Sequence, residues 1–133
     1  MAVRIVRLGS PREPGEGVRL GTVRRPPRGV PKSEFASRDF YDAWLPTLAP
    51  SAELMAWIKA EEITPARWTQ FARKYRTEMG QGEAPHVVAA LAALSQHGDF
   101  AVGCYCEDEA RCHRSLLRAL LGEAGAKVGA RAS

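Results

Sequence analysis

The strongest constraint on the fold is a short apolar run, Phe100-Ala-Val-Gly-Cys-Tyr-Cys106, which lies between Gly98-Asp99 and an acidic loop. An apolar run of this length, bounded by turn residues, is typical of a strand that is buried on both faces. Such strands occur mainly in parallel sheets that are covered by helices. The run therefore predicts an α/β domain in which residues 100–106 form the central strand.

Two segments near the N-terminus show the alternation of half-buried strands. Residues 3–8 alternate apolar and basic side chains, and residues 18–24 alternate in the same way. The glycine- and proline-rich stretch 9–17 between them predicts a turn, and a hairpin of the two strands is one arrangement that the sequence allows. Residues 126–129 could add a last short strand.

Helices are predicted between these strands and after the central one. Ser51 is a suitable N-cap for a helix over 52–60, and Thr64-Pro65 begins an amphipathic helix that ends at Gly80. A third helix opens near Pro85, and a fourth spans roughly 109–121, whereas 33–50 is irregular. The predicted fold is thus a single α/β domain over 1–133, a small mixed or parallel sheet with layered helices. Its core is about 3–121, and its tail, 130–133, is frayed.

Composition excludes several classes of protein. Hydrophobic residues make up 45% and charged residues 26%, which is ordinary for a globular chain. No apolar run reaches the roughly 18 residues that span a bilayer, and the first 15 residues lack the apolar stretch of a secretory signal. The three cysteines are an odd number, which argues against a disulfide framework. We therefore expect a cytoplasmic protein with no membrane partner.

The basic residues concentrate in the N-terminal quarter. Residues 1–32 carry eight arginine or lysine residues against two glutamates, a net charge of +6, whereas the remaining 101 residues carry −2. Such an excess favours an anionic partner: phosphate, a nucleotide or a nucleic acid. A solvated basic face is the alternative that needs no ligand.

The segment Cys112-His113-Arg114-Ser115 follows the central strand and enters a helix. Ligands of parallel α/β sheets bind beyond the carboxyl ends of the strands, and helix N-termini attract anions. Three interpretations remain open. The segment could form an anion pocket with a reactive thiol. It could bind zinc together with Cys104 and Cys106, although neighbouring helical residues point about 100° apart. It could also simply pack in the core.

A second candidate is the loop Arg24-Arg25-Pro26-Pro27-Arg28-Gly29. Prolines stiffen it, the glycine allows a tight bend, and its arginines can grip a phosphate in two places. If the strand before it lies parallel to the central strand and next to it, both loops meet at one edge of the sheet. We then expect Arg24, Arg28, Cys112, His113 and Arg114 to line one cationic cavity.

Four patterns in the chain resemble a known family. They are an arginine-rich proline loop, an Ala-Pro-Ser helix start, an aromatic helix that carries a glutamate, and a late histidine. The matching residues are Arg24, Pro27, Arg28 and Gly29; Ala49, Pro50, Ser51 and Leu54; Trp68, Phe71, Tyr75 and Glu78; and His113. Over about residues 3–121 the chain resembles the YeaO-like family, a bacterial and archaeal domain of unknown function. That resemblance implies an α/β fold and a cytoplasmic protein but no established activity.

The chain also departs from that family's pattern. Val23 stands where the family has an aspartate, and Pro26 stands where it has a tryptophan before the proline. The first change argues against a catalytic role that needs a carboxylate at position 23. The pattern Cys106 … Cys112-His113-Arg114 resembles a wider branch of the same superfamily, which carries Cys-x-Glu … Cys-His-Arg.

The function we rank first is an enzyme that acts on a phosphorylated or nucleotide-like substrate, without a cofactor or a metal ion. In it, Cys112 and His113 are the catalytic candidates, and Arg24, Arg28, Arg114 and Ser115 bind the anion. A nucleic-acid-binding module and a non-catalytic interaction domain, with or without homo-oligomerisation, are the alternatives. The sequence has no P-loop, no GxGxxG and no HC-x5-R spacing, which argues against those classes.

Overall fold

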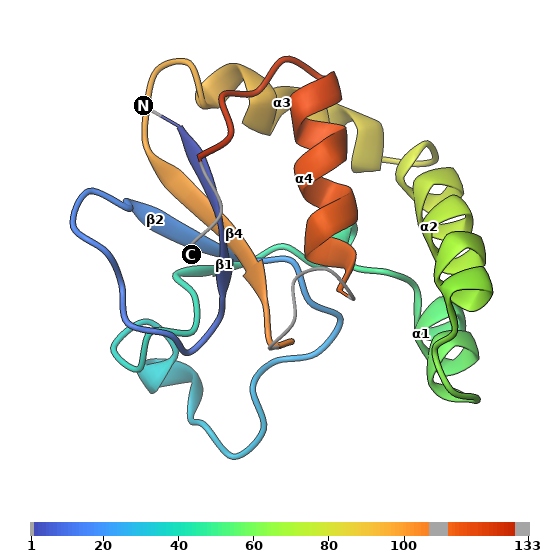
Figure 1. Cartoon of the computed structure of the whole chain (residues 1–133). Coiled ribbons are helices and arrows are strands. Elements are labelled where there is room, and N and C mark those ends of the chain that lie inside the picture. Colours follow the sequence, from blue (N-terminus) through green and yellow to red (C-terminus); the bar gives the residue numbers. More distant parts are fainter. Residues whose placement is uncertain (1, 107–111, 130–133) are drawn as a thin grey trace.

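The computed structural model describes residues 2–106 and 112–129 and forms a single α/β domain (Figure 1). The elements, in chain order, are β1 Val3–Arg7, β2 Val18–Gly21, η1 Lys32–Glu34, β3 Ala43–Trp44, η2 Pro46–Leu48, α1 Ala52–Lys59, α2 Pro65–Met79, α3 Ala84–Leu94, β4 Phe100–Cys104 and α4 His113–Glu123. The predicted fold class is confirmed. The expected start of the last helix at 109–111 and the frayed tail at 130–133 lie outside the described residues.

The sheet has the order β1-β4-β2-β3, and each neighbouring pair is parallel. β4 is buried along its whole length, as its apolar run predicts. Because it needs cover on both edges and both faces, it takes the centre, and the two basic-apolar strands flank it. The hairpin of the first two strands is therefore wrong: β1 and β2 each pair with β4.

Two pairings extend the sheet beyond the three main strands. β3 has two residues, which pair with Leu20 and Gly21 of β2, and it lies in the segment that the sequence left irregular. A strand of two residues is too short to show a periodic pattern. Near the other edge, Val128 forms an isolated parallel bridge with Val3, which is what remains of the short strand expected at 126–129.

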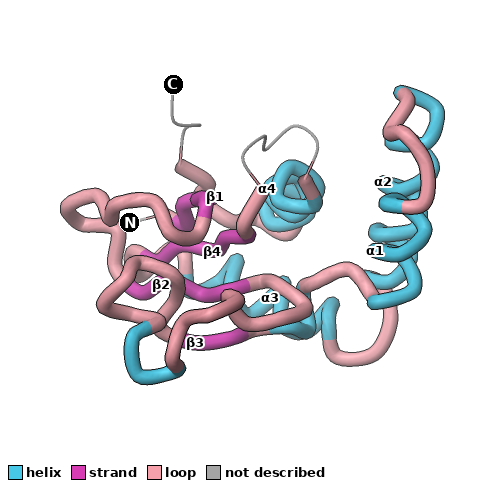
Figure 2. The backbone as a smooth tube through the Cα atoms, turned by 90° about the horizontal axis from the view of Figure 1, so that it is seen from below, coloured by secondary structure: helices cyan, strands magenta, loops and turns pink. Residues whose placement is uncertain are grey.

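The helices cover one side of the sheet. Figure 2 shows α3 and α4 on the same side of the strands, with α1 and α2 beyond them. The helix starts agree with the predicted caps, since Ser51 Oγ accepts from Leu54 N at 3.1 Å and Thr64 Oγ1 accepts from Arg67 N at 3.1 Å. Of the described helices, none is both long enough and apolar enough to cross a membrane.

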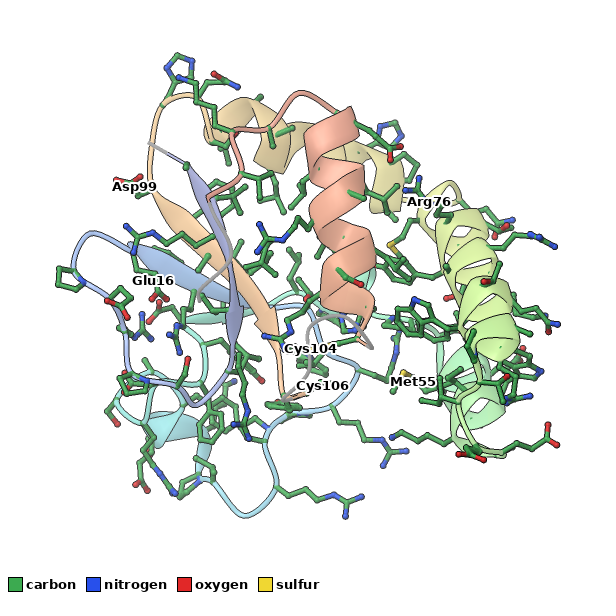
Figure 3. All side chains as sticks on the ribbon, in the orientation of Figure 1. Glu16, Met55, Arg76, Asp99, Cys104 and Cys106 are labelled. Carbon is green, nitrogen blue, oxygen red and sulfur yellow. A yellow bond between two sulfur atoms is a disulfide. The ribbon has the colours of Figure 1, made fainter. Side chains whose placement is uncertain are left out.

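The other side of the sheet is covered by loops around a buried arginine. Arg19 of β2 is 1% exposed, and its Nε and Nη2 donate to the carboxylate of Glu16, which is 2% exposed. Nη1 donates to the carbonyl oxygens of Ser10 at 2.8 Å and Asp39 at 2.6 Å. Figure 3 shows Glu16 among these loops, on the side of the sheet away from α4. Arg19 thus joins two loops to β2, the one that carries Ser10 and Glu16 and the one that carries Asp39.

Breaking this ion pair should destabilise the fold strongly. Glu16→Gln removes the charge that compensates Arg19 while it keeps the size of the side chain, and an uncompensated buried charge costs about 3–5 kcal/mol. We expect the free energy of unfolding in urea to fall by about 3 kcal/mol. Glu13→Gln, a change at an exposed glutamate of the same loop, is the control. Equal losses in the two variants would contradict this role of the pair.

Acidification tests the same ion pair. Burial alone would raise the pKa of Glu16, but the Arg19 guanidinium and the Glu13 N–H outweigh burial and hold that pKa below its ordinary value of 4.5. A lowered carboxyl pKa stabilises the fold above the unfolded-state value, and this stabilisation is lost as the pH falls through the folded-state value. Urea unfolding between about pH 7 and pH 3 should therefore show a steeper loss in the wild type than in Glu16→Gln. If the stability of both proteins fell equally with pH, this role of Glu16 would be contradicted.

Candidate functional site

The two loops that the sequence singled out meet at the carboxyl edge of the sheet. β2 and β4 are parallel neighbours, so the chain leaves both strands at the same edge. Just past β2, the N–H and Oγ1 of Thr22 both donate to the carbonyl oxygen of Gly103 at 3.0 Å. Tyr105 reaches across from β4 and donates its hydroxyl to the carbonyl oxygen of Arg25 at 2.9 Å. The expected convergence of the loops is therefore present.

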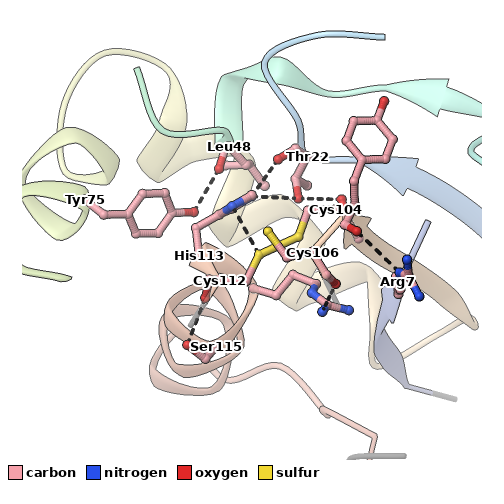
Figure 4. The surroundings of a disulfide bond; sticks show 12 residues. Arg7, Thr22, Leu48, Tyr75, Cys104, Cys106, Cys112, His113 and Ser115 are labelled. Atoms are coloured by element: carbon pink, nitrogen blue, oxygen red, sulfur yellow. Dashed lines mark hydrogen bonds between the residues drawn. A yellow bond between two sulfur atoms is a disulfide. The ribbon is translucent and has the colours of Figure 1, made fainter. Parts of the chain in front are cut away.

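The connection from β4 to α4 brings the cysteines together. Cys104 ends β4, and Cys112 precedes α4 as its N-cap, with an extended backbone at φ −127° and ψ 150°. Their sulfur atoms reach the same place, where the structure joins them in a disulfide (Figure 4). The odd cysteine count argued against such a bond. Cys106, the third cysteine, is a free, exposed thiol.

His113 is the first residue of α4 and lies in the interior, 7% exposed. Its Nε2 lies 2.7 Å from the carbonyl oxygen of Thr22, and its Nδ1 lies 3.7 Å from Cys112 Sγ. Since a carbonyl oxygen only accepts, Nε2 carries the proton and Nδ1 keeps its lone pair. The pKa of His113 is lowered to about 4, mainly by burial; the bond to the carbonyl oxygen of Thr22 opposes this shift, and the nearby Arg114 adds to it. The imidazole is therefore neutral at pH 7.

The remaining residues of the helix start bind main-chain groups. Arg114 is 4% exposed, and its Nη2 donates to the carbonyl oxygen of Cys106 at 2.6 Å. Ser115 donates its hydroxyl to the carbonyl oxygen of Cys112 at 3.0 Å, within the first turn of α4. Both contacts order the backbone around the cysteines.

The arginines of the other loop are exposed. Arg24 donates from Nε to the carbonyl oxygen of Pro50 at 3.2 Å and from Nη2 to that of Ala49 at 3.4 Å, so it turns toward the segment before α1. Arg28 is exposed next to Gly29, whose φ of +71° makes the bend. The structure thus brings the loops together and binds the Arg24 side chain to the segment before α1.

Two cavities lie beside α1 and α2, and they share Ser51 and Glu78. One has a volume of about 410 Å³ and is also lined by Glu53, Leu54, Trp57, Lys74 and Thr77. The other has a volume of about 320 Å³ and is also lined by Arg24, Thr47, Ala49, Met79, Gln81, Glu83 and Ala84. Among the described residues that the sequence predicted for the site, Arg24 lines one of these two cavities, and the others line neither.

Glu78 is held in place at the wall between the cavities. Its Oε1 accepts from the backbone N–H of Ser51 at 2.8 Å, and its Oε2 accepts from the Ser51 hydroxyl. These bonds place the carboxylate at the N-terminus of α1, where the helix dipole stabilises a negative charge. Nearby, the buried Tyr75 donates its hydroxyl to the carbonyl oxygen of Leu48 at 2.8 Å. The polar residues of α2 thus fix the segment 48–51.

Sequence reasoning did not place Glu78 in the site. A signal was nevertheless present, because Glu78 follows Tyr75 by three residues and so shares the buried face of α2 with it. A carboxylate near the C-terminus of a helix is disfavoured by the helix dipole. An acidic residue in such a position, on an apolar face, indicates a partner elsewhere in the fold.

The fold and site define a class: a parallel α/β domain with its polar residues gathered at and beside the carboxyl edge of the sheet. Over residues 3–125 the chain belongs to the family DUF488-N3a, described as the active DUF488-N3 subclade. This confirms the YeaO-like resemblance, since YeaO is a member of the DUF488 family. No curated protein matches the chain. No solved structure matches it either.

Two tyrosines offer a matched test of how the site is held. Tyr75→Phe leaves the buried carbonyl of Leu48 without its donor, which costs about 1–3 kcal/mol. Tyr105→Phe removes a similar bond from the half-buried Tyr105 to Arg25. This bond is exposed to solvent, so water replaces the donor, and we expect a smaller loss in the free energy of unfolding. Urea denaturation of both variants measures the difference. A larger loss in Tyr105→Phe would refute this account of the segment 48–51.

Proposed function

We propose that this chain is an anion-binding α/β domain and an enzyme that acts on a small phosphorylated or nucleotide-like molecule. The observation that carries the proposal is the cavity of about 320 Å³ that Arg24 and Glu78 line together. A guanidinium and a fixed carboxylate in one cavity can bind the phosphate and the hydroxyl or N–H groups of the same ligand. Both are shallow hollows that open widely to solvent, so a ligand bound in either would stay partly exposed.

Arg24 suits the role of phosphate ligand. The carbonyl oxygens of Ala49 and Pro50 bind two of its nitrogens and fix the plane of the guanidinium. Its Nη1 has no hydrogen-bond partner among the described residues. A pre-oriented guanidinium loses less entropy when it binds an anion than a free one does.

Glu78 suits the role of acceptor and general base. Two donors on Ser51 hold its carboxylate, and the same side chain borders both cavities. A carboxylate in that place can accept from a sugar hydroxyl or a base N–H, or take a proton from a nucleophile. Lys74, which lines the larger cavity, adds a second cation near the same wall.

In this proposal Cys112 and His113 are not catalytic, unlike in the sequence-based prediction. Both are buried, and His113 binds the carbonyl oxygen of Thr22, two residues before Arg24. This contact makes His113 a positioning residue for the loop that carries Arg24. The word "active" in the family description agrees with an enzyme. We also propose a cytoplasmic location, where the cysteines that the structure pairs would be reduced.

The net charge of the N-terminal quarter favours nucleic-acid binding, but the contacts of its arginines favour it less. Arg19 forms the buried ion pair with Glu16. Arg12 binds the carboxylate of Asp42 at 2.8 Å and lies 3.4 Å from that of Asp39. These two of the eight cations are therefore already neutralised within the fold. We keep nucleic-acid binding as an outcome of the test rather than as a second proposal.

Calorimetric titration with inorganic phosphate, a nucleoside, its monophosphate and its diphosphate tests the proposal. We expect the phosphorylated compounds to bind at least about 10-fold more tightly than the nucleoside. Arg24→Gln should weaken their binding by about 10- to 100-fold, the usual loss when a charge-assisted hydrogen bond is removed. Arg73→Gln, a change at an exposed arginine of α2, is the matched control and should bind as the wild type does.

Turnover of any bound compound is followed by phosphorus NMR and mass spectrometry. Glu78→Gln should keep binding but lose turnover by at least about 100-fold if the carboxylate is the base. Absence of saturable binding to all four compounds, or equal binding by Arg24→Gln and the wild type, would overturn the proposal. Tight, steeply salt-dependent binding of RNA or DNA that Arg24→Gln leaves intact would favour the nucleic-acid module instead.

A further inference from the structure

The cysteines at the carboxyl edge of the sheet form a three-sulfur cluster. The Sγ atoms of Cys104, Cys106 and Cys112 all lie within 4.8 Å of one another. They come from the end of β4, from two residues beyond it and from the N-cap of α4, so three separate backbone positions converge there. Figure 4 shows the three side chains directed toward one point beside His113.

His113 offers a donor atom next to one member of the cluster. Its Nδ1 lies 3.7 Å from Cys112 Sγ, and its Nε2 is bonded to the carbonyl oxygen of Thr22. Because Nε2 donates its N–H to this carbonyl, Nδ1 carries a lone pair, and Cys112 Sγ is the sulfur atom next to it. Histidines that bind a metal ion commonly donate their other ring N–H to a backbone carbonyl in this way.

We infer that, in the reduced protein, Cys104, Cys106, Cys112 and His113 bind one zinc ion through three sulfur atoms and Nδ1. Three thiolates and an imidazole are the ligand set of closed, tetrahedral structural zinc sites. With zinc–sulfur bonds of about 2.3 Å, two sulfur ligands lie about 3.8 Å apart, and sulfur and nitrogen ligands lie slightly closer. The three sulfur atoms lie within 4.8 Å of one another and need only small shifts to reach that arrangement. Nδ1 of His113 is near Cys112 Sγ, and its ring must move toward the other two sulfur atoms when the ion binds.

The backbone spacing favours a metal ion over a direct sulfur–sulfur bond. The Cα atoms of Cys104 and Cys112 are 7.9 Å apart, and disulfides usually join Cα atoms that are about 4.4–6.8 Å apart. A metal ion between the two sulfur atoms adds a second bond to the bridge and spans the wider gap. The disulfide and the zinc site are thus alternative states of one cluster.

The geometry also removes the objection that the sequence raised against joint ligation. Two neighbouring helical residues would point about 100° apart. Cys112, however, is extended at the N-cap, and only His113 is helical. A change of backbone conformation between the two residues lets both side chains reach the same point.

The charges around the cluster favour the bound ion. Zinc with three thiolates and a neutral imidazole carries a net charge of −1, which suits the N-terminus of α4. Arg114, buried next to it, holds the carbonyl oxygen of Cys106 and adds a positive charge. Three thiols release three protons when the ion binds, so affinity should rise with pH.

Metal titration of the reduced protein tests the inference. A water-soluble phosphine reduces the disulfide to two thiols and is itself oxidised to the phosphine oxide, and a chelator then removes bound metal. We expect one cobalt ion per chain, with the visible bands of tetrahedral coordination and an ultraviolet sulfur-to-cobalt band. Zinc should then displace the cobalt, and elemental analysis should find one zinc per chain.

Cys106→Ser is the decisive variant, because Cys106 is exposed and its loss should leave the fold intact. It should weaken zinc binding by at least about 10-fold and lower the sulfur-to-cobalt band by about a third. His113→Gln should shift the visible bands, while His97→Gln, at an exposed histidine, is the control and should match the wild type.

Several outcomes would overturn the inference. One is a reduced protein that binds less than one zinc ion per chain. Another is a weak cobalt spectrum typical of oxygen ligands. A third is a Cys106→Ser variant with the cobalt spectrum and zinc affinity of the wild type. The zinc titration is independent of the phosphate titration, since Arg24 and Glu78 lie outside the cluster, so either proposal can fail alone.

Discussion

The parallel pairing of β2 with β4 is the interaction on which the rest of the structure depends. It sets Gly21 beside Gly103, so that the backbone leaves both strands at the same height. Thr22 then binds Gly103 through its N–H and its hydroxyl, which extends the pairing beyond the end of β2. Without this register, the arginine loop and the cysteine cluster would lie at different edges of the sheet.

The elements that could be predicted from the sequence are those whose cause is local. The position of β4 follows from one apolar run, and the starts of α1 and α2 follow from Ser51 and Thr64 as N-caps. The pairing of the strands is not local. It depends on which strand must be covered on both edges. β4 is the most apolar strand and takes that place, so β1 and β2 pair with β4 and not with each other, although turn residues connect them.

In the candidate site, too, the features with a local cause could be predicted and the others could not. The sequence could predict that two loops meet at one edge, because that follows from parallel strands. It could not tell which arginines would be buried inside the fold, because alternation assigns Arg19 and Arg24 to opposite faces of the strand but does not show what covers each face. Arg19 became a buried partner of Glu16, whereas Arg24 reached a cavity with Glu78. Periodicity gives the face of each arginine, whereas the loops that pack on that face decide whether the arginine is buried.

The cysteine cluster and the Arg24 cavity share one support. His113 binds the carbonyl oxygen of Thr22, and its ring lies 5.7 Å from that of Tyr75, which in turn holds the carbonyl of Leu48. Leu48 leads directly into Ala49 and Pro50, whose carbonyl oxygens fix the guanidinium of Arg24. A zinc ion on Nδ1 would lock the His113 ring, and through these bonds it would stiffen both segments that position Arg24. The metal would then act on the cavity by ordering its walls, without touching a ligand bound there.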